Sequence, residues 1–215
     1  MADLAEISSG IIERFEATNI ARDRALNEGR QVTRLSANAV RAIHRAEYDE
    51  ASQLLESAKS LLLALAESLA PHPGVYWQGY VQDPMKEYAE ARITLAMVRN
   101  TALPGPSELG VEDAPYLNGL AEAASELRRE VLDSMRHGDL ARSESLLAMM
   151  ESAYDLLVTI DFPDGITGGL RRTTDQLRAV LERTRNDLTL TLTQERLERA
   201  LREAEATFRS AAGQS

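Results

Sequence analysis

The sequence predicts an all-α fold of about seven antiparallel helices, the first of them long. Alanine, leucine, glutamate and arginine dominate the composition and favour helices, while the 215 residues include only 12 glycines and 7 prolines. Apolar residues recur at helical spacing, and neither a strand-rich region nor an internal repeat is found. A chain of this length buries one sizeable core, so we expect residues 1–215 to form a single domain.

Glycines, prolines and capping residues set the expected helix boundaries. They predict helices at residues 3–46, 49–69, 75–100, 112–137, 139–160, 167–185 and 193–212. We expect the first helix to bend near Gly10 or Gly29, and Asp49 to cap the second. The Pro-His-Pro-Gly segment at residues 71–74 ends that second helix.

The remaining helices follow from similar signals. Pro84 lies early in the third helix, so we expect it to start or kink that helix. The Pro-Gly-Pro segment at residues 104–106 is a loop, and Asp139 caps the fifth helix after Gly138. Residues 186–192 alternate polar and apolar like a strand, but a lone strand would have no partner. We therefore expect a bend between the sixth and seventh helices.

The chain contains no cysteine, which excludes disulfides and thiolate metal sites. Residues 1–20 carry acidic residues and no continuous apolar core, so no secretory signal is expected. The most apolar run, residues 61–66, is far too short to span a membrane. These features predict a cytoplasmic protein with no membrane partner.

Charge is unevenly distributed along the chain. A net charge of −10 argues against non-specific nucleic-acid binding over the whole surface but does not exclude a local basic groove. On the first helix, four arginines fall within about 60° of one another, opposite the apolar face. They are Arg30, Arg34, Arg41 and Arg45. This stripe is either a solvated charged face or a track for phosphates, and four aligned arginines in an acidic chain favour the track.

Two carboxylates in the third helix suggest chemistry. Glu87 and Glu90 lie three residues apart and therefore on one helix face. At about 5–6 Å and an effective dielectric of about 20, two negative charges repel by roughly 3 kcal/mol. A cation, a raised pKa or a nearby arginine must offset this repulsion. Oxygen-only ligands suit Mg²⁺ or Mn²⁺, so the pair is a candidate metal site, although most such residues are simply surface acids.

Three segments form an ordered set of motifs. The first is Glu87-Tyr88-Ala89-Glu90-Ala91, and the second runs from Val111 to Arg128. The third combines Asp133-Ser134, Gly138-Asp139 and the Ala-Tyr-Asp-Leu-Leu segment at residues 153–157. In this order they resemble the translin family, on the side of translin's partner, translin-associated factor X. The resemblance extends over about residues 21–201, most of the chain.

This resemblance implies a prokaryotic or archaeal homo-oligomeric member: a seven-helix subunit assembling into a closed octameric shell around nucleic acid. It also implies a Mg²⁺-dependent endoribonuclease acting on single-stranded RNA, with Glu87, Glu90 and Asp155 as catalytic metal ligands. Glu126 is a fourth candidate ligand. A bound Mg²⁺, or Mn²⁺, would activate water and stabilise charge on the attacked phosphate. Translin itself lacks the acidic pair, so this chain looks closer to the catalytic partner.

Three further residues near these motifs each have two alternative roles. His44 resembles a family histidine, and a structural or helix-dipole role competes with phosphate contact. Arg92, just beyond Glu90, either contacts phosphate or pairs with a carboxylate. Trp77, ahead of the acidic helix, either packs an interface or stacks an unpaired base.

Three functions follow from these observations. The first is a homo-oligomeric metal-dependent endoribonuclease. The second is a non-catalytic oligomer that binds single-stranded RNA or DNA, and the third is a helical scaffold that binds no nucleic acid. Cleavage lost in Glu87→Gln or Glu90→Gln would select the first, and salt-sensitive binding without cleavage would select the second.

Overall fold

The computed structural model describes residues 3–212, which are helical over most of their length and contain no strand. Six helices are long: α1 (Leu4–His44), α2 (Tyr48–Leu69), α4 (Gly79–Val98), α6 (Asp113–Arg136), α7 (Leu140–Leu157) and α9 (Leu170–Ala212). Three are single turns in the connections: α3 (Pro73–Tyr76), α5 (Pro106–Leu109) and α8 (Asp164–Thr167). The all-α class and the long first helix are thus confirmed.

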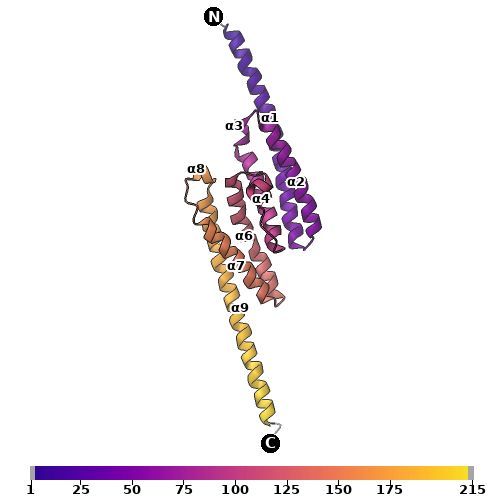
Figure 1. The fold of residues 1–215 in the computed structure, drawn as a ribbon, viewed down its shortest axis with the longest axis vertical. Helices are drawn as coiled ribbons and strands as arrows, with labels where there is room; N and C mark the ends of the chain where they lie inside the picture. The colour runs from indigo at the N-terminus through magenta and orange to yellow at the C-terminus, as the bar shows by residue number, and fades with distance from the viewer. Residues whose placement is uncertain (1–2, 213–215) are drawn as a thin grey trace.

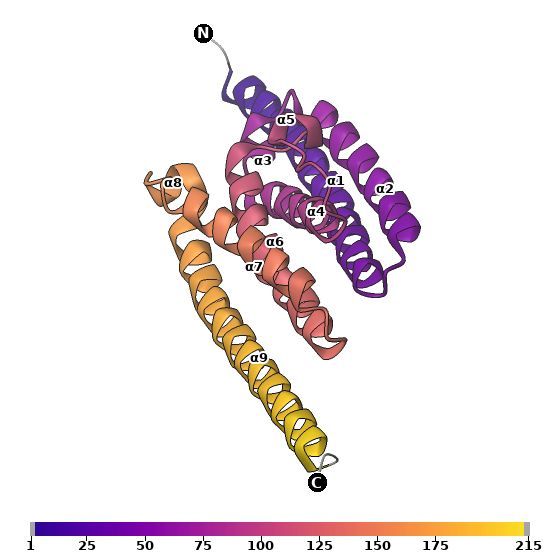
Figure 2. The same ribbon diagram turned by 60° about the horizontal axis from the view of Figure 1, so that its bottom comes forward.

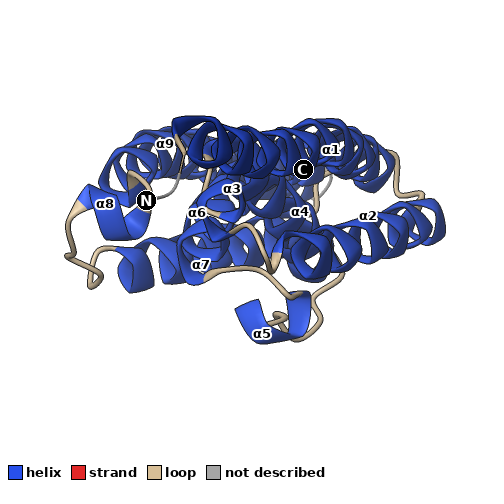
Figure 3. Ribbon diagram, turned by 90° about the horizontal axis from the view of Figure 1, so that it is seen from above, coloured by secondary structure: helices blue, strands red, loops and turns tan. Residues whose placement is uncertain are grey.

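Helices α4 and α6 form the centre of the molecule. On one side α1 packs against α4 and carries α2, and on the other side α6 packs against α7 and α9 (Figures 2 and 3). The first part of α1 and the end of α9 project from opposite ends of this body (Figure 1). Side chains at residues 11–20 and 196–209 are accordingly exposed.

A buried apolar cluster draws on every long helix. At its centre, Met85, Tyr88 and Ile93 of α4 are fully buried. The second half of α4 is buried on all sides, since every residue from 93 to 98 is buried. Glu87 and Glu90 are each only half-buried, which leaves them at the edge of the α4–α6 contact. None of the helices described is both long and apolar enough to cross a membrane.

Close helix contact depends on glycine at Gly29 of α1. A Cβ built there would lie 2.7 Å from the Tyr80 carbonyl oxygen and 3.1 Å from Pro84 Cγ. In a regular helix the Tyr80 carbonyl would accept a hydrogen bond from the backbone N–H of residue 84, four positions later. Proline at position 84 has no N–H, so this carbonyl lacks its usual helix partner. As expected, one helix runs through both Gly10 and Gly29, because α1 is continuous from Leu4 to His44.

Two expected boundaries are wrong. The sixth and seventh helices are a single helix, α9, because the buried positions Leu177, Leu181, Thr184 and Leu188 continue the helical period through the region expected to bend. Threonine hydroxyls there donate to carbonyls four residues back, as Thr189 does to Arg185 at 2.7 Å. The expected third helix is divided at Trp77–Gln78, and Pro84 lies inside α4.

The two expected caps have different outcomes. Asp139 accepts a hydrogen bond from the Arg142 backbone N–H at 2.9 Å, as expected. Asp49 is not the cap of α2, because that helix begins at Tyr48 and Asp49 lies within its first turn. An acidic residue in a first turn still interacts favourably with the helix dipole.

Candidate metal centre

A glycine sets the distance between the two central helices at the acidic residues. A Cβ built on Gly119 of α6 would lie 2.9 Å from both the Glu90 backbone nitrogen and the Lys86 carbonyl oxygen of α4. Only glycine allows the backbones to approach this closely. Glu122 lies three residues after Gly119, on the adjoining part of the same helix face. The close approach therefore brings Glu122 to the acidic face of α4.

The result is a cluster of three half-buried carboxylates: Glu87, Glu90 and Glu122, called here the carboxylate cluster. One oxygen from each lies within 4.8 Å of the other two. Three carboxylate oxygens at this spacing form a donor set that suits a hard divalent cation such as Mg²⁺ or Mn²⁺. The residues present therefore fit the metal that the sequence led us to expect.

Lys86 supplies positive charge to the carboxylate cluster. Its ammonium lies 2.8 Å from Glu122 Oε1 and 3.4 Å from Glu87 Oε1. Burial acts to lower the pKa of Lys86, but the bonds to Glu122 and Glu87 outweigh burial and raise that pKa above its ordinary value. Lys86 is therefore charged at neutral pH, and one ammonium faces three carboxyl groups.

Glu90 is the carboxyl group of the cluster that forms no ion pair with a described cation. Among the described residues it has neither an ion pair nor a side-chain hydrogen bond. Burial, followed by the charges of Glu122, Glu87 and Glu126, raises the pKa of Glu90 to about 8. The carboxyl group consequently holds a proton at neutral pH unless a cation replaces it. A desolvated carboxyl group beside two others is a pattern found at functional sites.

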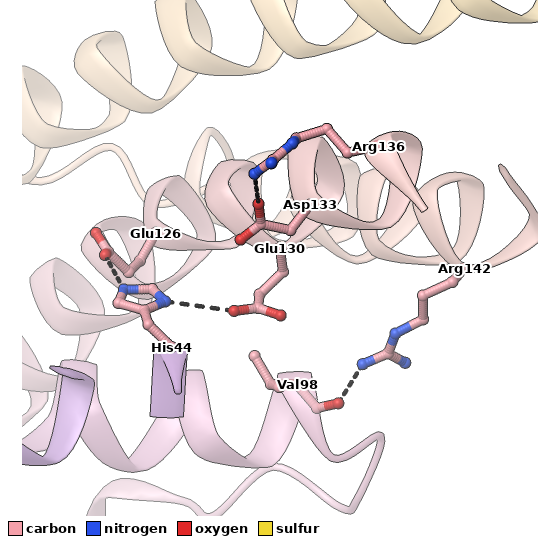
Figure 4. A network of polar contacts seen from close by, with 7 residues as sticks. All are labelled: His44, Val98, Glu126, Glu130, Asp133, Arg136 and Arg142. Atoms are coloured by element: carbon pink, nitrogen blue, oxygen red, sulfur yellow. Dashed lines mark hydrogen bonds and ion pairs between the residues drawn. The ribbon is translucent and has the colours of Figure 1, made fainter. Parts of the chain in front are cut away.

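Glu126, the fourth candidate ligand, is engaged by His44 (Figure 4). His44 Nε2 lies 2.5 Å from Glu126 Oε1, and His44 Nδ1 lies 3.3 Å from Glu130 Oε1. The hydrogen bonds to Glu126 and Glu130 raise the pKa of His44 to about 9, while the bond to His44 lowers the pKa of Glu126. Glu126 is thus paired with an imidazolium rather than grouped with the carboxylate cluster.

His44 is not placed for phosphate contact. Its side chain is only 5% exposed, and both ring nitrogens face carboxylates of α6. Of the two readings of this histidine, the structure supports the structural one: His44 ties the end of α1 to α6.

Asp155 does not join the carboxylate cluster. The buried face of α7 comprises Leu146, Met150, Ala153 and Leu157. Asp155 is two residues from Ala153 and from Leu157, which places it on the opposite face of the helix. It is exposed and lines a surface cavity with Glu151, Arg178 and Arg185. The sequence motif that suggested Asp155 therefore does not bring it to Glu87 and Glu90 within this subunit.

The arginine stripe is exposed as expected. Arg30, Arg34 and Arg41 line a surface groove of about 430 Å³ between α1 and α4. Neither Arg30 nor Arg34 has an ion pair or side-chain hydrogen bond among the described residues, whereas Arg41 donates to Asn38 at 2.6 Å. Arg45 pairs with Glu47 and Glu50, and Arg92 pairs with Glu56 at 2.8 Å. Within the stripe, the unpaired positive charge is thus at Arg30 and Arg34.

Comparisons with known proteins identify the family. No family model matches the chain. "Uncharacterized protein MJ0175" of Methanocaldococcus jannaschii is 33% identical over 174 residues, which cover 78% of this chain and 74% of that protein. Two solved structures, AfC3PO and its complex with duplex RNA, are 30% identical with TM-scores of 0.80 and 0.81, and the match covers 86% of this chain. The chain belongs to the translin family.

A more distant structure shares the fold. The translin-family chain matches apo-NeC3PO with a TM-score of 0.78 at 20% identity, over 89% of this chain and 100% of that one. At this identity the match shows the shared fold alone.

Sequence reasoning missed Glu122 of this translin-family chain. The signal was present, because Glu122 lies one turn before Glu126, which had been nominated, and therefore shares its face. Gly119, one turn earlier still, marks the place where a second helix can approach. Lys86 was also missed, although it directly precedes Glu87.

Proposed function

We propose that this translin-family protein is a divalent-cation-dependent endoribonuclease that acts on single-stranded RNA within a homo-oligomeric shell. One observation carries the proposal: three carboxylates from two helices converge within 4.8 Å, and Lys86 alone among the described residues partly neutralises them. A cluster of this kind costs free energy unless a cation or protons offset the repulsion. Such a cost is often associated with a functional site.

Each residue of the carboxylate cluster has a defined part in the proposal. Glu87, Glu90 and Glu122 would hold Mg²⁺ or Mn²⁺ through carboxylate oxygens, and Glu90 would have to give up its proton to act as a ligand. When bound, the cation supplies Lewis-acid stabilisation of phosphate charge and an activated water. His44 keeps Glu126 ionised next to the cluster, which adds negative charge without adding a ligand. Lys86 would supply a positive charge beside these carboxylates that can contact a negatively charged phosphate.

RNA as the ligand is supported by the family and by the arginine stripe. AfC3PO has been solved with duplex RNA. In this chain Arg30 and Arg34 offer unpaired guanidinium groups beside a groove, and guanidinium groups bind phosphate bidentately. The resemblance favours single-stranded RNA as the molecule that is cut, and single-stranded DNA as a second ligand.

Assembly into an oligomer is supported by the projecting helix ends. Apolar side chains lie exposed on the first part of α1 and the last part of α9, where no described residue covers them. They include Leu4, Phe15, Ile20, Leu197, Leu201 and Phe208, with exposures between 56% and 81%. Exposed apolar side chains gathered in this way are typical of interaction surfaces. Family resemblance favours an octamer of identical subunits.

A second function is supported by Lys86. Its ammonium already bridges Glu87 and Glu122, as a permanent substitute for a metal would. In that case the protein binds single-stranded RNA or DNA as an oligomer and cuts neither.

Cleavage of a labelled, unstructured RNA tests the proposal. We expect cleavage with Mg²⁺, none with EDTA, and at least about tenfold slower cleavage by Glu90→Gln and Glu122→Gln, since each removes a ligand. Glu144→Gln, an exposed residue of α7, is the matched control and should cut normally. RNA binding without cleavage would select the non-catalytic function. Cleavage lost in Asp155→Asn but kept in Glu122→Gln would refute the carboxylate cluster as the site.

A further inference from the structure

A cavity of about 760 Å³ adjoins the carboxylate cluster. Residues of α4, α6, α8, the turn after α8 and the start of α9 line it, and it shares Lys86 and Glu122 with the cluster. This volume lies within the usual range of small-ligand sites and is ample for one nucleoside. The proposed phosphate site and the cavity are therefore next to each other.

An aromatic ring stands at the rim of this cavity. Trp77 is 60% exposed, although tryptophan is highly buried on average. It packs edge-on against Tyr76, with ring centroids 5.1 Å apart and an interplanar angle of 87°. Tyr76 is fixed in turn, because its hydroxyl donates to Glu112 at 2.6 Å. Trp77 is thus a supported ring open to solvent, which is the arrangement that stacks unpaired bases.

The polar groups of the cavity favour a base over a phosphate in its interior. Four carboxylates and two cations line it, so a phosphate inside would be repelled. Asp83 and Asp113 have no hydrogen-bond or ion-pair partner among the described side chains, and carboxylates accept hydrogen bonds from base amino groups. Arg172 is likewise unpaired and exposed at the cavity, where it can contact a phosphate outside.

We propose that this cavity is a base-binding subsite for the nucleotide adjoining the phosphate at the carboxylate cluster. The unpaired base stacks on Trp77, its amino edge faces Asp83 and Asp113, and its own phosphate lies on Arg172. Bases that carry an exocyclic amino group (adenine, cytosine and guanine) are preferred over uracil. The inference rests on RNA as the ligand in the proposed function and adds a base preference to it.

The fluorescence of Trp77 tests the subsite without any need for cleavage. The chain has a single tryptophan, so quenching reports this ring alone. In EDTA, we expect a six-nucleotide oligoadenylate to quench the emission strongly, oligouridylate of the same length more weakly, and an abasic oligomer of equal charge not at all. Equal quenching by the abasic oligomer would overturn stacking. Equal affinity for adenylate and uridylate would overturn the amino preference.

Variants separate the cavity from general charge effects. Asp113→Asn should reduce the difference in binding affinity between oligoadenylate and oligouridylate. Arg172→Gln should weaken the binding of both oligomers. Arg196→Gln, an exposed arginine of α9 outside the cavity, should change neither. An effect of Arg196→Gln as large as that of Arg172→Gln would refute a specific role for Arg172.

A cleavage assay with Mg²⁺ distinguishes failure of the subsite from failure of the nuclease. Trp77→Ala should weaken RNA binding by at least about fivefold, the lower limit for loss of one stacked base, and should change the preferred cut positions. Trp77→Phe keeps an aromatic ring and should retain most of the binding. Normal cutting at unchanged positions by Trp77→Ala would overturn the subsite. If the wild type cuts nothing, the nuclease proposal fails, while quenching by adenylate still supports the subsite.

Discussion

Gly119 of α6 rests on the backbone of Glu90 in α4, so closely that a Cβ at Gly119 would lie 2.9 Å from the Glu90 nitrogen. This contact joins the fold to the proposed chemistry. It fixes the register of two helices that are distant in sequence, and the register decides that Glu122 meets Glu87 and Glu90. Both packing and the metal centre should therefore respond to a single methyl group.

Gly119→Ala tests this coupling. The added methyl group must push α4 and α6 apart, and overpacking of this kind costs about 1–3 kcal/mol of unfolding free energy. The change should also weaken Mn²⁺ binding, because it moves Glu122 away from Glu90. Thermal unfolding and Mn²⁺ titration measure the two effects. Gly74→Ala is the control, since a Cβ built there meets no packed neighbour within 4 Å. Unchanged stability and unchanged Mn²⁺ affinity in Gly119→Ala would contradict the close contact.

Cation affinity should rise with pH because of Glu90. Its pKa is about 8 without a cation, so binding at neutral pH must displace a proton from this carboxyl group. We expect Mn²⁺ affinity to increase between about pH 6.5 and 8.5 and then to level off. Isothermal titration in buffers of different ionisation enthalpy would count the released proton. A flat affinity over this range would mean that Glu90 is not a ligand.

The same carboxyl group makes the metal-free protein less stable as pH rises. The folded-state pKa of about 8 exceeds the ordinary value of 4.5, so the folded state holds more protons than the unfolded state between these values. Unfolding free energy therefore falls as pH increases through that window. Glu90→Gln should reduce this fall, and urea unfolding in EDTA across the window measures it. An unchanged pH dependence in the variant would contradict the raised pKa.

The positively charged imidazolium of His44 also makes stability depend on pH. Its pKa rises from 6.5 to about 9 on folding, so its stabilisation is fully present below pH 6.5 and is lost as pH rises through 9. His44→Gln should remove this contribution and cost about 1–3 kcal/mol near pH 6, because Glu126 and Glu130 lose a charged partner. Urea unfolding at pH 6 and pH 9.5 checks both points. His137→Gln, on an exposed residue, should have a much smaller effect.

The arginine stripe should govern the salt dependence of RNA binding. Replacing Arg30 and Arg34 together with glutamine removes two unpaired guanidinium groups from the groove on α1. We expect weaker binding and a slope of log affinity against log salt reduced by about 1–2, since each phosphate contact on a single strand contributes about 0.7. Fluorescence anisotropy between low and moderate salt measures the slope. Arg178→Gln removes an arginine already paired with Glu182 and should leave the slope unchanged.

Local signals predicted most of the fold. Proline and glycine positions placed the end of α2 and the break between α6 and α7, and Asp139 was correctly identified as a cap because capping depends on neighbouring residues. The continuous α9 was missed, because the alternation at residues 186–192 imitates a strand while Leu188 in fact extends a helical stripe. A short alternating run is weak information when the longer period agrees with a helix.

The candidate site was predicted only in part. Glu87 and Glu90 share a helix turn, so sequence alone could pair them. Glu122 joins them through the packing of α4 on α6, a contact that no local pattern encodes. Asp155 was suggested by a motif on another helix, and its exposed position depends on which face of α7 is buried. Helix register, rather than motif content, decides which carboxylates converge.

Mn²⁺ binding followed by electron paramagnetic resonance tests the central claim most directly, because it needs neither RNA nor catalysis. We predict one bound Mn²⁺ per subunit, at least about tenfold weaker binding in Glu122→Gln, and unchanged binding in Asp155→Asn. No Mn²⁺ bound by the wild type, or binding lost in Asp155→Asn and kept in Glu122→Gln, would contradict the carboxylate cluster as the metal centre.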